Sequence, residues 1–151
     1  MVKNGRIFNL NLDSPKYGNK VLVTKEQENN VRERKLTFSF LHFRQIQNFH
    51  IGDCTKEWHA GLIERLGVLS TMTPRELRED NRGSDALRCH HIDWSAKNIP
   101  IKRKDLDWLP KEILENEDDF PIMQLSISNS TGRIVGYFDR DPSIFHIILL
   151  D

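Results

Sequence analysis

Residues 121–151 read PIMQLSISNSTGRIVGYFDRDPSIFHIILLD, and this stretch decides the fold. Apolar and polar residues alternate at its start, which predicts a strand with one buried face. Two turn sequences follow, Asn129–Gly132 and Asp139–Pro142, and the glycine of the first turn suits a positive φ. Because both connections are short, we expect an antiparallel meander of three strands. The predicted strands are Pro121–Ser128, Arg133–Phe138 and Ser143–Leu150.

The last strand of this meander is apolar on both faces. Strict alternation divides its side chains into two sets, Phe145, Ile147 and Leu149 on one face and Ile144, His146, Ile148 and Leu150 on the other. A strand with two apolar faces belongs in the interior of a sheet. A lone histidine in such a strand is more often a hydrogen-bonded core or sheet-edge residue than a catalyst, so His146 is interpreted as structural.

Upstream of the meander, a helical period predicts a helix over Cys54–Leu69, capped by Asp53 or Thr55. Its apolar stripe should pack against Phe145, Ile147 and Leu149 of the last strand. The stripe consists of Trp58, Leu62, Leu66 and Leu69. The sequence Thr73-Pro74-Arg75-Glu76 combines an N-cap hydroxyl, a proline and a capping-box glutamate, which predicts a second, short helix.

Other segments give weaker patterns. Lys35–Arg44 alternates and is rich in aromatic residues, which predicts a strand. Leu87–Trp94 is predicted to be extended, and Asp105–Leu114 to form one or two helical turns around Pro110. Residues 1–34 are less regular, with short strand candidates at Arg6–Leu12 and Lys20–Thr24. Together these elements predict a single α+β domain over residues 1–151, with a twisted antiparallel or mixed sheet packed against one main helix.

The charge of the chain is balanced overall but polarised along the sequence. The 151 residues carry no net charge, which argues against a general nucleic-acid binder. Residues 1–44 hold nine basic and four acidic side chains, whereas residues 105–151 hold three and ten. Such a distribution marks either a nucleic-acid-binding face or two halves that attract each other on folding, and we favour the second interpretation.

The composition indicates a globular protein, with 38% hydrophobic and 29% charged residues. The sequence has no apolar run long enough to cross a membrane and no secretory signal, so we expect a cytoplasmic protein without membrane contact. Cys54 and Cys89 are interpreted as free thiols that behave as small hydrophobic residues.

The segment Arg88–Trp94, with the sequence RCHHIDW, is the first candidate for chemistry. His90 and His91 could serve as general acid and base on a phosphodiester, while Arg88 and Arg133 hold its negative charge. If the segment is extended, the two histidines project to opposite faces. The alternative interpretation is that both histidines are hydrogen-bonded strand residues, and we consider it the more common situation.

Contacts to nucleic acid are predicted for a second set of residues. Lys102, Arg103 and Lys104 form a short basic run, and Tyr137 shares a strand face with Arg133. The alternatives are a solvated basic surface for the first three residues and a salt bridge to an acidic loop for Arg133.

Metal and cofactor sites are not predicted. Zinc-type ligands are present, but they lack the spacing of a zinc knuckle; they are His50, Cys54, His59, Cys89 and His91. Phosphate-binding glycine loops, nucleophile elbows and zinc-protease motifs are absent from the sequence, which argues against ATPases, α/β-hydrolases and zinc proteases.

The tail GRIVGYF followed by IFHIILLD resembles the ending of small bacterial proteins of phage and other mobile elements. Those proteins often have an upstream tryptophan helix and a histidine–aspartate–tryptophan stretch, as here with Trp58 and His91–Trp94. The tail is also similar to the meander of the RelE-like toxin fold. That resemblance implies mRNA cleavage by a metal-independent endoribonuclease, with RNA and an antitoxin as partners.

The sequence therefore suggests two functions. The first is a RelE-like, RNA-interacting toxin that uses His90, His91, Arg88 and Arg133. The second is a phage or defence-associated accessory protein without enzymatic activity, which binds another protein through its acidic C-terminal or basic N-terminal half. A homodimer is compatible with either function, and fold resemblance alone does not decide between them.

Overall fold

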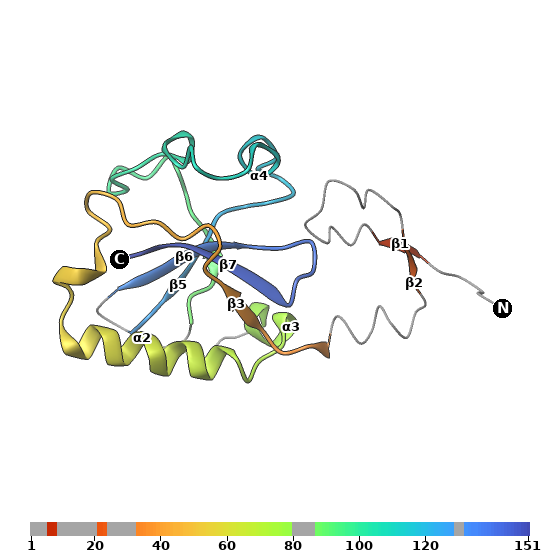
Figure 1. The fold of residues 1–151 in the computed structure, drawn as a ribbon, viewed down its shortest axis with the longest axis horizontal. Coiled ribbons are helices and arrows are strands. Elements are labelled where there is room, and N and C mark those ends of the chain that lie inside the picture. Colours follow the sequence, from red (N-terminus) through yellow and green to blue (C-terminus); the bar gives the residue numbers. More distant parts are fainter. Residues whose placement is uncertain (1–5, 9–20, 24–32, 80–86, 129–131) are drawn as a thin grey trace.

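The computed structural model describes residues 6–8, 21–23, 33–79, 87–128 and 132–151. A five-stranded mixed sheet lies at the centre of this part of the chain, with the strand order β3-β7-β6-β5-β4 (Figure 1). The strands are β3 (Thr37–Ser39), β4 (His90–His91), β5 (Met123–Ser126), β6 (Arg133–Phe138) and β7 (Ile144–Leu150). The predicted α+β class is confirmed.

The C-terminal meander is confirmed as well. β5, β6 and β7 follow one another in antiparallel pairs, and β7 lies between β6 and the parallel strand β3. Gly132 has a φ of 79°, as its turn sequence predicts. Farther upstream, β1 (Arg6–Phe8) and β2 (Val21–Val23) form an antiparallel pair within the two predicted N-terminal strands; the remainder of those predictions lies outside the described residues.

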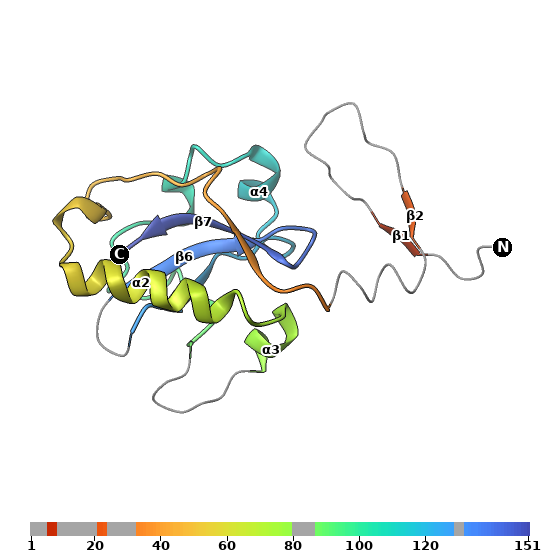
Figure 2. The same cartoon turned by 60° about the horizontal axis from the view of Figure 1, so that its bottom comes forward.

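Three helices are described. α2 (Lys56–Leu69) covers one face of the sheet, and the short helix α3 (Pro74–Arg78) follows it on the same side (Figure 2). The Thr55 hydroxyl accepts a hydrogen bond from the Trp58 backbone N–H and caps α2, and the capping box predicted at Thr73 is present. α4 (Lys111–Glu115) begins directly after Pro110, on the opposite side of the sheet. Among the described residues, no helix is long and apolar enough to cross a lipid bilayer.

A β-bulge corrects the predicted faces of the last strand. Val135 pairs with Leu149 and Gly136 pairs with Ile147, which leaves Ile148 as an extra residue in β7. Leu150 therefore joins Phe145 and Ile147 in the core under α2, whereas Leu149 lies with Ile148 in the second core. Gly136 lies at this irregularity, where a Cβ atom would be only 2.1 Å from the His146 carbonyl oxygen. Alternation alone could not reveal this change of face.

Two predicted strands are shorter than expected. The Lys35–Arg44 strand is reduced to β3, because the Ser39 hydroxyl accepts from the Leu41 N–H and a turn follows, closed by the Phe43 N–H and the Phe40 carbonyl. The Leu87–Trp94 strand is reduced to β4, because Arg88 has a φ of 50°, in the left-handed region. The turn after β3 carries His42 across the sheet face opposite α2, where it contacts Tyr137 and His146.

The sheet separates two hydrophobic cores. One core lies under α2 and contains Trp58, Leu62 and Leu69 from that helix, as predicted, with Leu66 only partly buried. The other core lies on the opposite face of the sheet. Its side chains outside the sheet come from Phe49 and from the segment Leu106–Ile122, which includes α4. Strand β7 therefore has an apolar environment on both sides, which its two apolar faces predicted.

Candidate functional site

A cleft lies at the end of the sheet where β6 turns into β7. It consists of two adjoining cavities of about 740 and 100 Å³, which share Phe120, Asp139 and Arg140. We call the pair the hairpin cleft. The larger cavity is also lined by Arg78, His91, Asp118, Asp119, Pro121, Met123, Phe138 and Pro142, and the smaller by His42, Pro110, Glu112, Ile113, Tyr137 and His146.

The smaller cavity is lined by a hydrogen-bonded pair, the buried His146 and the partly buried Asp139. The Nε2 atom of His146 lies 2.6 Å from Oδ2 of Asp139, which follows the last residue of β6. His146 is only 6% exposed, because it lies in the central strand β7. A carboxylate at this distance holds the imidazole in one orientation.

The Asp139 carboxyl has opposing influences on its pKa. Burial acts to raise it, but hydrogen bonds from His146 and from the backbone N–H groups of Asp141 and Arg140, together with the charge of His146, outweigh burial. The pKa is therefore lowered from its ordinary value of 3.8. The group that faces His146 is a carboxylate near neutral pH.

This arrangement determines the tautomer of neutral His146. Because the Asp139 carboxylate only accepts hydrogen bonds, Nε2 of His146 must carry the proton. The lone pair is then on Nδ1, which is buried and has no hydrogen-bond partner among the described residues. A buried basic nitrogen without a donor is an unusual feature, and such features are concentrated at functional sites.

Two aromatic rings, those of Tyr137 and His42, are packed against His146. Tyr137 is stacked against it with ring centroids 4.9 Å apart, and His42 lies 5.5 Å away on a tilted plane. His42 is the more exposed of the two histidines. Its backbone is held in place by Trp108, whose indole N–H donates to the His42 carbonyl oxygen at 2.8 Å. Two imidazoles therefore lie side by side in the cleft.

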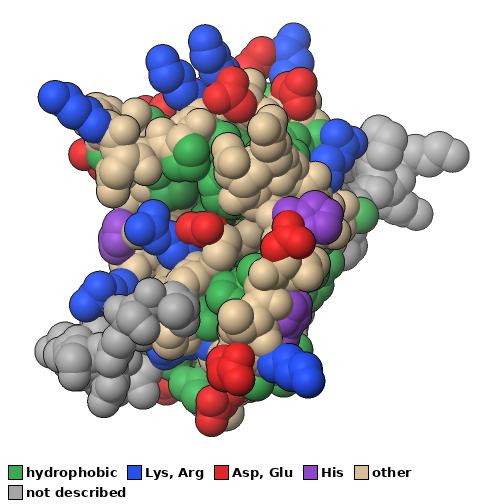
Figure 3. All heavy atoms as spheres, turned by 90° about the vertical axis from the view of Figure 1, so that its left-hand side faces the viewer, with side chains coloured by type: hydrophobic (Ala, Val, Ile, Leu, Met, Phe, Trp, Pro, Cys, Tyr) green, Lys and Arg blue, Asp and Glu red, His purple; other side chains and the backbone are tan. Residues whose placement is uncertain are grey.

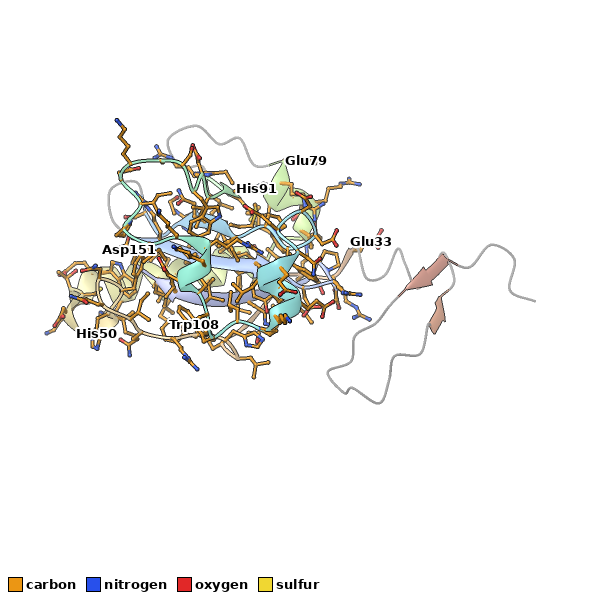
Figure 4. The ribbon with its side chains drawn as sticks, turned by 90° about the horizontal axis from the view of Figure 1, so that it is seen from above. Glu33, His50, Glu79, His91, Trp108 and Asp151 are labelled. Carbon is orange, nitrogen blue, oxygen red and sulfur yellow. The ribbon has the colours of Figure 1, made fainter. Side chains whose placement is uncertain are left out.

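Two arginines flank the larger cavity with their guanidinium groups over aromatic rings. Arg140 lies 5.7 Å from the centre of the Phe120 ring and forms an ion pair with Glu112 of α4. Arg78, the last residue of α3, lies 5.9 Å from the centre of the Phe138 ring. His91 and Arg78 both line this cavity. In the view of Figure 4, His91 lies on the same side of the sheet as Glu79, the residue that follows α3.

The four residues predicted as catalytic are divided between the two faces of the sheet. His91 pairs with Met123 and lines the larger cavity of the hairpin cleft. His90 instead accepts a hydrogen bond from the side-chain amide of Gln124 at 2.9 Å and donates from Nδ1 to the His91 carbonyl oxygen. Gln124 and Arg133 line a separate cavity of about 40 Å³ on the opposite face of the sheet.

Arg88 is the last of the four residues predicted as catalytic. The pairing of the strands places it toward Arg133 and away from the hairpin cleft. The Leu87 carbonyl accepts from the Ser126 N–H, and Ser126 is paired with Arg133 across β5 and β6. Arg88 and Arg133 thus lie toward the same end of these strands. His90 pairs with Gln124 nearer the other end of β5, and His91 beside it faces the other side of the sheet. The roles assigned to these four residues stay predictions.

The residues predicted to contact nucleic acid also differ in their surroundings. Lys102 and Lys104 are exposed, whereas Tyr137 is 2% exposed and packed against His146. The Arg103 guanidinium donates to the carbonyl oxygens of Ile113, Leu114 and Phe120, and burial lowers its pKa. Arg103 therefore holds the end of α4. On the face of the molecule drawn in Figure 3, basic and acidic side chains are interspersed.

No group of three or more metal-ligating side chains is found among the described residues. His50 accepts a hydrogen bond from the Gly52 N–H, and His59 donates to the Thr55 carbonyl oxygen, so both rings have local partners. Burial raises the pKa of the Cys89 thiol to about 11. Cys89 is thus a neutral thiol near pH 7.

Sequence reasoning missed most of the hairpin cleft. It singled out His91, Tyr137 and His146, but interpreted His146 as structural and assigned no role to His42, Asp139 or Arg140. A carboxylate seven residues before a histidine, across a predicted two-strand hairpin, was a signal for the Asp139–His146 pair. Nothing local to His42 predicts its contact with a strand more than one hundred residues later. Comparison of the chain with protein-family models, curated proteins and solved structures found no match.

Proposed function

We propose that this protein is an RNA-interacting protein of the RelE-like toxin type, which cleaves RNA without a metal ion in the hairpin cleft. The observation that carries the proposal is the Asp139–His146 pair, beside a second histidine. In this pair the basic Nδ1 of His146 has no hydrogen-bond partner in the part of the chain that the structure describes. Cleavage of RNA by its own 2′-hydroxyl needs a base, an acid and a positive charge near the phosphate. The cleft contains one group for each role.

His146 is the base in this proposal. Its Nδ1 takes the proton of the 2′-hydroxyl, whose oxygen then bonds to the adjacent phosphorus, while Asp139 stabilises the imidazolium that forms. Protonated His42 gives its proton to the departing 5′-oxygen as the phosphorus–oxygen bond breaks. The products are a 2′,3′-cyclic phosphate and a 5′-hydroxyl. Because Nδ1 is buried, side chains around His146 must move when RNA binds.

Arg140 supplies the positive charge. Its guanidinium lies over Phe120 and, among the described residues, has one ion-pair partner, Glu112, so further N–H groups remain for phosphate oxygens. The Glu112 contact fixes the orientation of the guanidinium, which lowers the entropy lost when phosphate binds.

The test is cleavage of a labelled single-stranded RNA by the full chain in the presence of EDTA. We expect cleavage without added metal, and a loss of about 10²-fold or more in His42→Ala and His146→Ala, the usual contribution of a general acid or base. His59→Ala is the matched control, because His59 is exposed on α2 and lines neither cavity of the cleft. Urea unfolding of each variant separates lost chemistry from lost folding.

The result also distinguishes the cleft from the sequence-based site. If Arg133→Ala abolishes cleavage and His42→Ala retains full activity, the reaction takes place on the sheet face that carries Gln124 and Arg133 instead. If neither the native chain nor any variant cleaves RNA in EDTA or in Mg²⁺, the proposed activity is wrong.

One observation favours the second candidate function, an accessory protein that binds another protein or a second copy of itself. Phe40 and Leu41 are 49% and 66% exposed in the turn that follows β3, an edge strand of the sheet. Exposed apolar side chains beside a sheet edge are typical of protein interfaces. A monomeric mass in solution, with no partner recovered from the native host by the native chain beyond that recovered by a Leu41→Glu variant, would contradict this function.

A further inference from the structure

The larger cavity of the hairpin cleft has the chemistry of a nucleotide pocket. Its volume of about 740 Å³ falls in the range of small-molecule sites. Its walls combine two arginines, two aromatic rings and a pair of adjacent carboxylates, Asp118 and Asp119. A cavity for phosphate alone would not be lined by these carboxylates, since they repel an anion.

The carboxylates are available to a ligand. Asp118 and Asp119 are exposed, and among the described residues neither has a hydrogen-bond or ion-pair partner. An ionised carboxylate only accepts hydrogen bonds, through two oxygens held side by side. Its best partner is a group with two adjacent N–H donors. Guanine alone among the four RNA bases has such a pair on its Watson–Crick edge, the ring N1–H and the exocyclic N2–H group.

The arginines suit the remaining parts of a nucleotide. Arg78 has no ion-pair partner among the described residues, and its planar guanidinium is held over Phe138. Arg140 faces the same cavity from the β6–β7 turn, over Phe120. A guanidinium plane stacks on a nucleobase, and its edge donates to phosphate oxygens. The opposite charges of this cavity therefore match the two ends of one ligand.

The position of the cavity relates base recognition to the reaction centre. Asp139 and Arg140 line both cavities of the cleft, so a base in the larger one places its ribose and phosphate beside the smaller one. The smaller cavity is lined by His146, whose Nδ1 is buried and has no hydrogen-bond partner among the described residues. A hydroxyl is the kind of donor that this nitrogen lacks.

From this arrangement we infer that the larger cavity recognises a guanine nucleotide, with its base on the Asp118–Asp119 carboxylates and its phosphate on Arg78 and Arg140. The inference rests on the proposed function in one respect, that the ligand is part of an RNA chain. It adds the specificity, cleavage next to guanosine. It also assigns roles to Arg78, Asp118 and Asp119, which the sequence analysis did not single out.

The test is calorimetric titration of the full chain with 5′-GMP, 5′-AMP, 5′-CMP and 5′-UMP. A bidentate contact to the correct base contributes about 1–3 kcal/mol of discrimination, so GMP should bind between about 5-fold and 150-fold more tightly than the other three. In Asp118→Asn/Asp119→Asn the affinity for GMP should fall to that of the others. Asp107→Asn is the matched control, because Asp107 is also exposed but does not line the cavity.

A second pair of variants tests the phosphate contact. Arg78→Gln should weaken all four nucleotides by a similar factor, since a phosphate contact does not distinguish bases. Arg75→Gln, one turn earlier on α3 and exposed, should leave all four affinities unchanged. Equal affinity for the four nucleotides, no binding of any of them, or a guanine preference that survives in the double variant would overturn the inference.

The two proposals fail separately. Cleavage of RNA with no preference for guanosine, together with unselective nucleotide binding, would refute the guanine pocket and leave the cleavage site intact. Selective binding of GMP by a chain that cleaves no RNA would support the pocket and refute the cleavage.

Discussion

At the scale of single residues, the side chain of His146 has the largest consequence. Its sequence context correctly indicates a buried histidine, because the strand around it is apolar on both faces. That context does not show which groups surround the ring. Asp139 reaches Nε2 across the β6–β7 turn, and His42 approaches from the loop after β3. Burial was thus predictable, whereas the hydrogen bond and the neighbouring ring were not.

The Asp139–His146 pair should make stability depend on pH. The pKa of Asp139 is lowered in the folded chain, so its contribution is fully present above the ordinary value of 3.8 and is lost as the pH falls through the folded value. We expect Asp139→Asn to lower the free energy of unfolding at pH 7 by about 1–3 kcal/mol, the usual cost of a hydrogen bond to a charged group. Urea titrations at pH 7 and pH 3 measure both quantities.

The same titrations contain their own check. The difference between the native chain and Asp139→Asn should shrink at pH 3, because this pH lies below the ordinary pKa of 3.8, so that the Asp139 carboxyl of the unfolded chain binds a proton. Asp107→Asn should match the native chain at both pH values, since Asp107 is exposed. A difference that stays constant from pH 7 to pH 3 would show that Asp139 does not act through its charge.

At the scale of elements, local signals predicted the helices well and the strands less well. Thr55 and Thr73 cap α2 and α3 through bonds to residues three positions away, so the sequence contains all the information needed. The lengths of β3 and β4 depend instead on the turn at Ser39–Leu41 and on the positive φ of Arg88. The bulge in β7 depends on pairing with β6, which a single strand does not encode.

The basic run predicts that Arg103 contacts nucleic acid, whereas its hydrogen bonds in the structure hold the end of α4. We expect Arg103→Gln to lower the free energy of unfolding by about 1.5–3 kcal/mol, because charge-assisted hydrogen bonds to two carbonyl oxygens at the end of α4 and to that of Phe120 are lost. Lys104→Gln, the adjacent exposed residue, should change stability by less than about 0.5 kcal/mol. Thermal unfolding followed by circular dichroism provides the comparison.

The two variants should also differ in RNA affinity if the basic run has its predicted role. Lys104→Gln would then weaken RNA binding without loss of stability. If Arg103→Gln is as stable as the native chain, the contacts of Arg103 at the end of α4 do not stabilise the fold, and its predicted contact with nucleic acid gains weight.

At the scale of the whole molecule, the order of the strands brings the hairpin cleft together. The parallel pairing of β3 with β7 carries the following loop, and His42 with it, across the sheet face. The segment that connects β4 to β5 contains α4 and the acidic residues Asp118 and Asp119. It places these carboxylates at the same end of the molecule. Contacts between residues so far apart in sequence are set by topology.

From this topology we expect the strands of the sheet to differ in the free energy needed for local opening. β7 is paired on both sides and buried from Phe145 to Leu150, whereas β4 is an exposed edge strand of two residues. Peptides covering residues 144–150 should exchange their amide hydrogens only through global unfolding, and peptides covering 87–94 through local opening at lower free energy. Hydrogen exchange followed by mass spectrometry measures both. Equal protection of the two segments would contradict the arrangement of the sheet.

The sequence by itself determined the α+β class, the C-terminal meander, the capped helices α2 and α3, and the burial of β7. Each of these follows from periodicity, capping or turn chemistry within about ten residues, and such signals are local by nature. The cleft was decided by tertiary structure, because a bulge, a parallel pairing and a loop placed His42, Asp139 and His146 around one cavity. The meander that determines the fold is therefore also the element on which the candidate site is assembled.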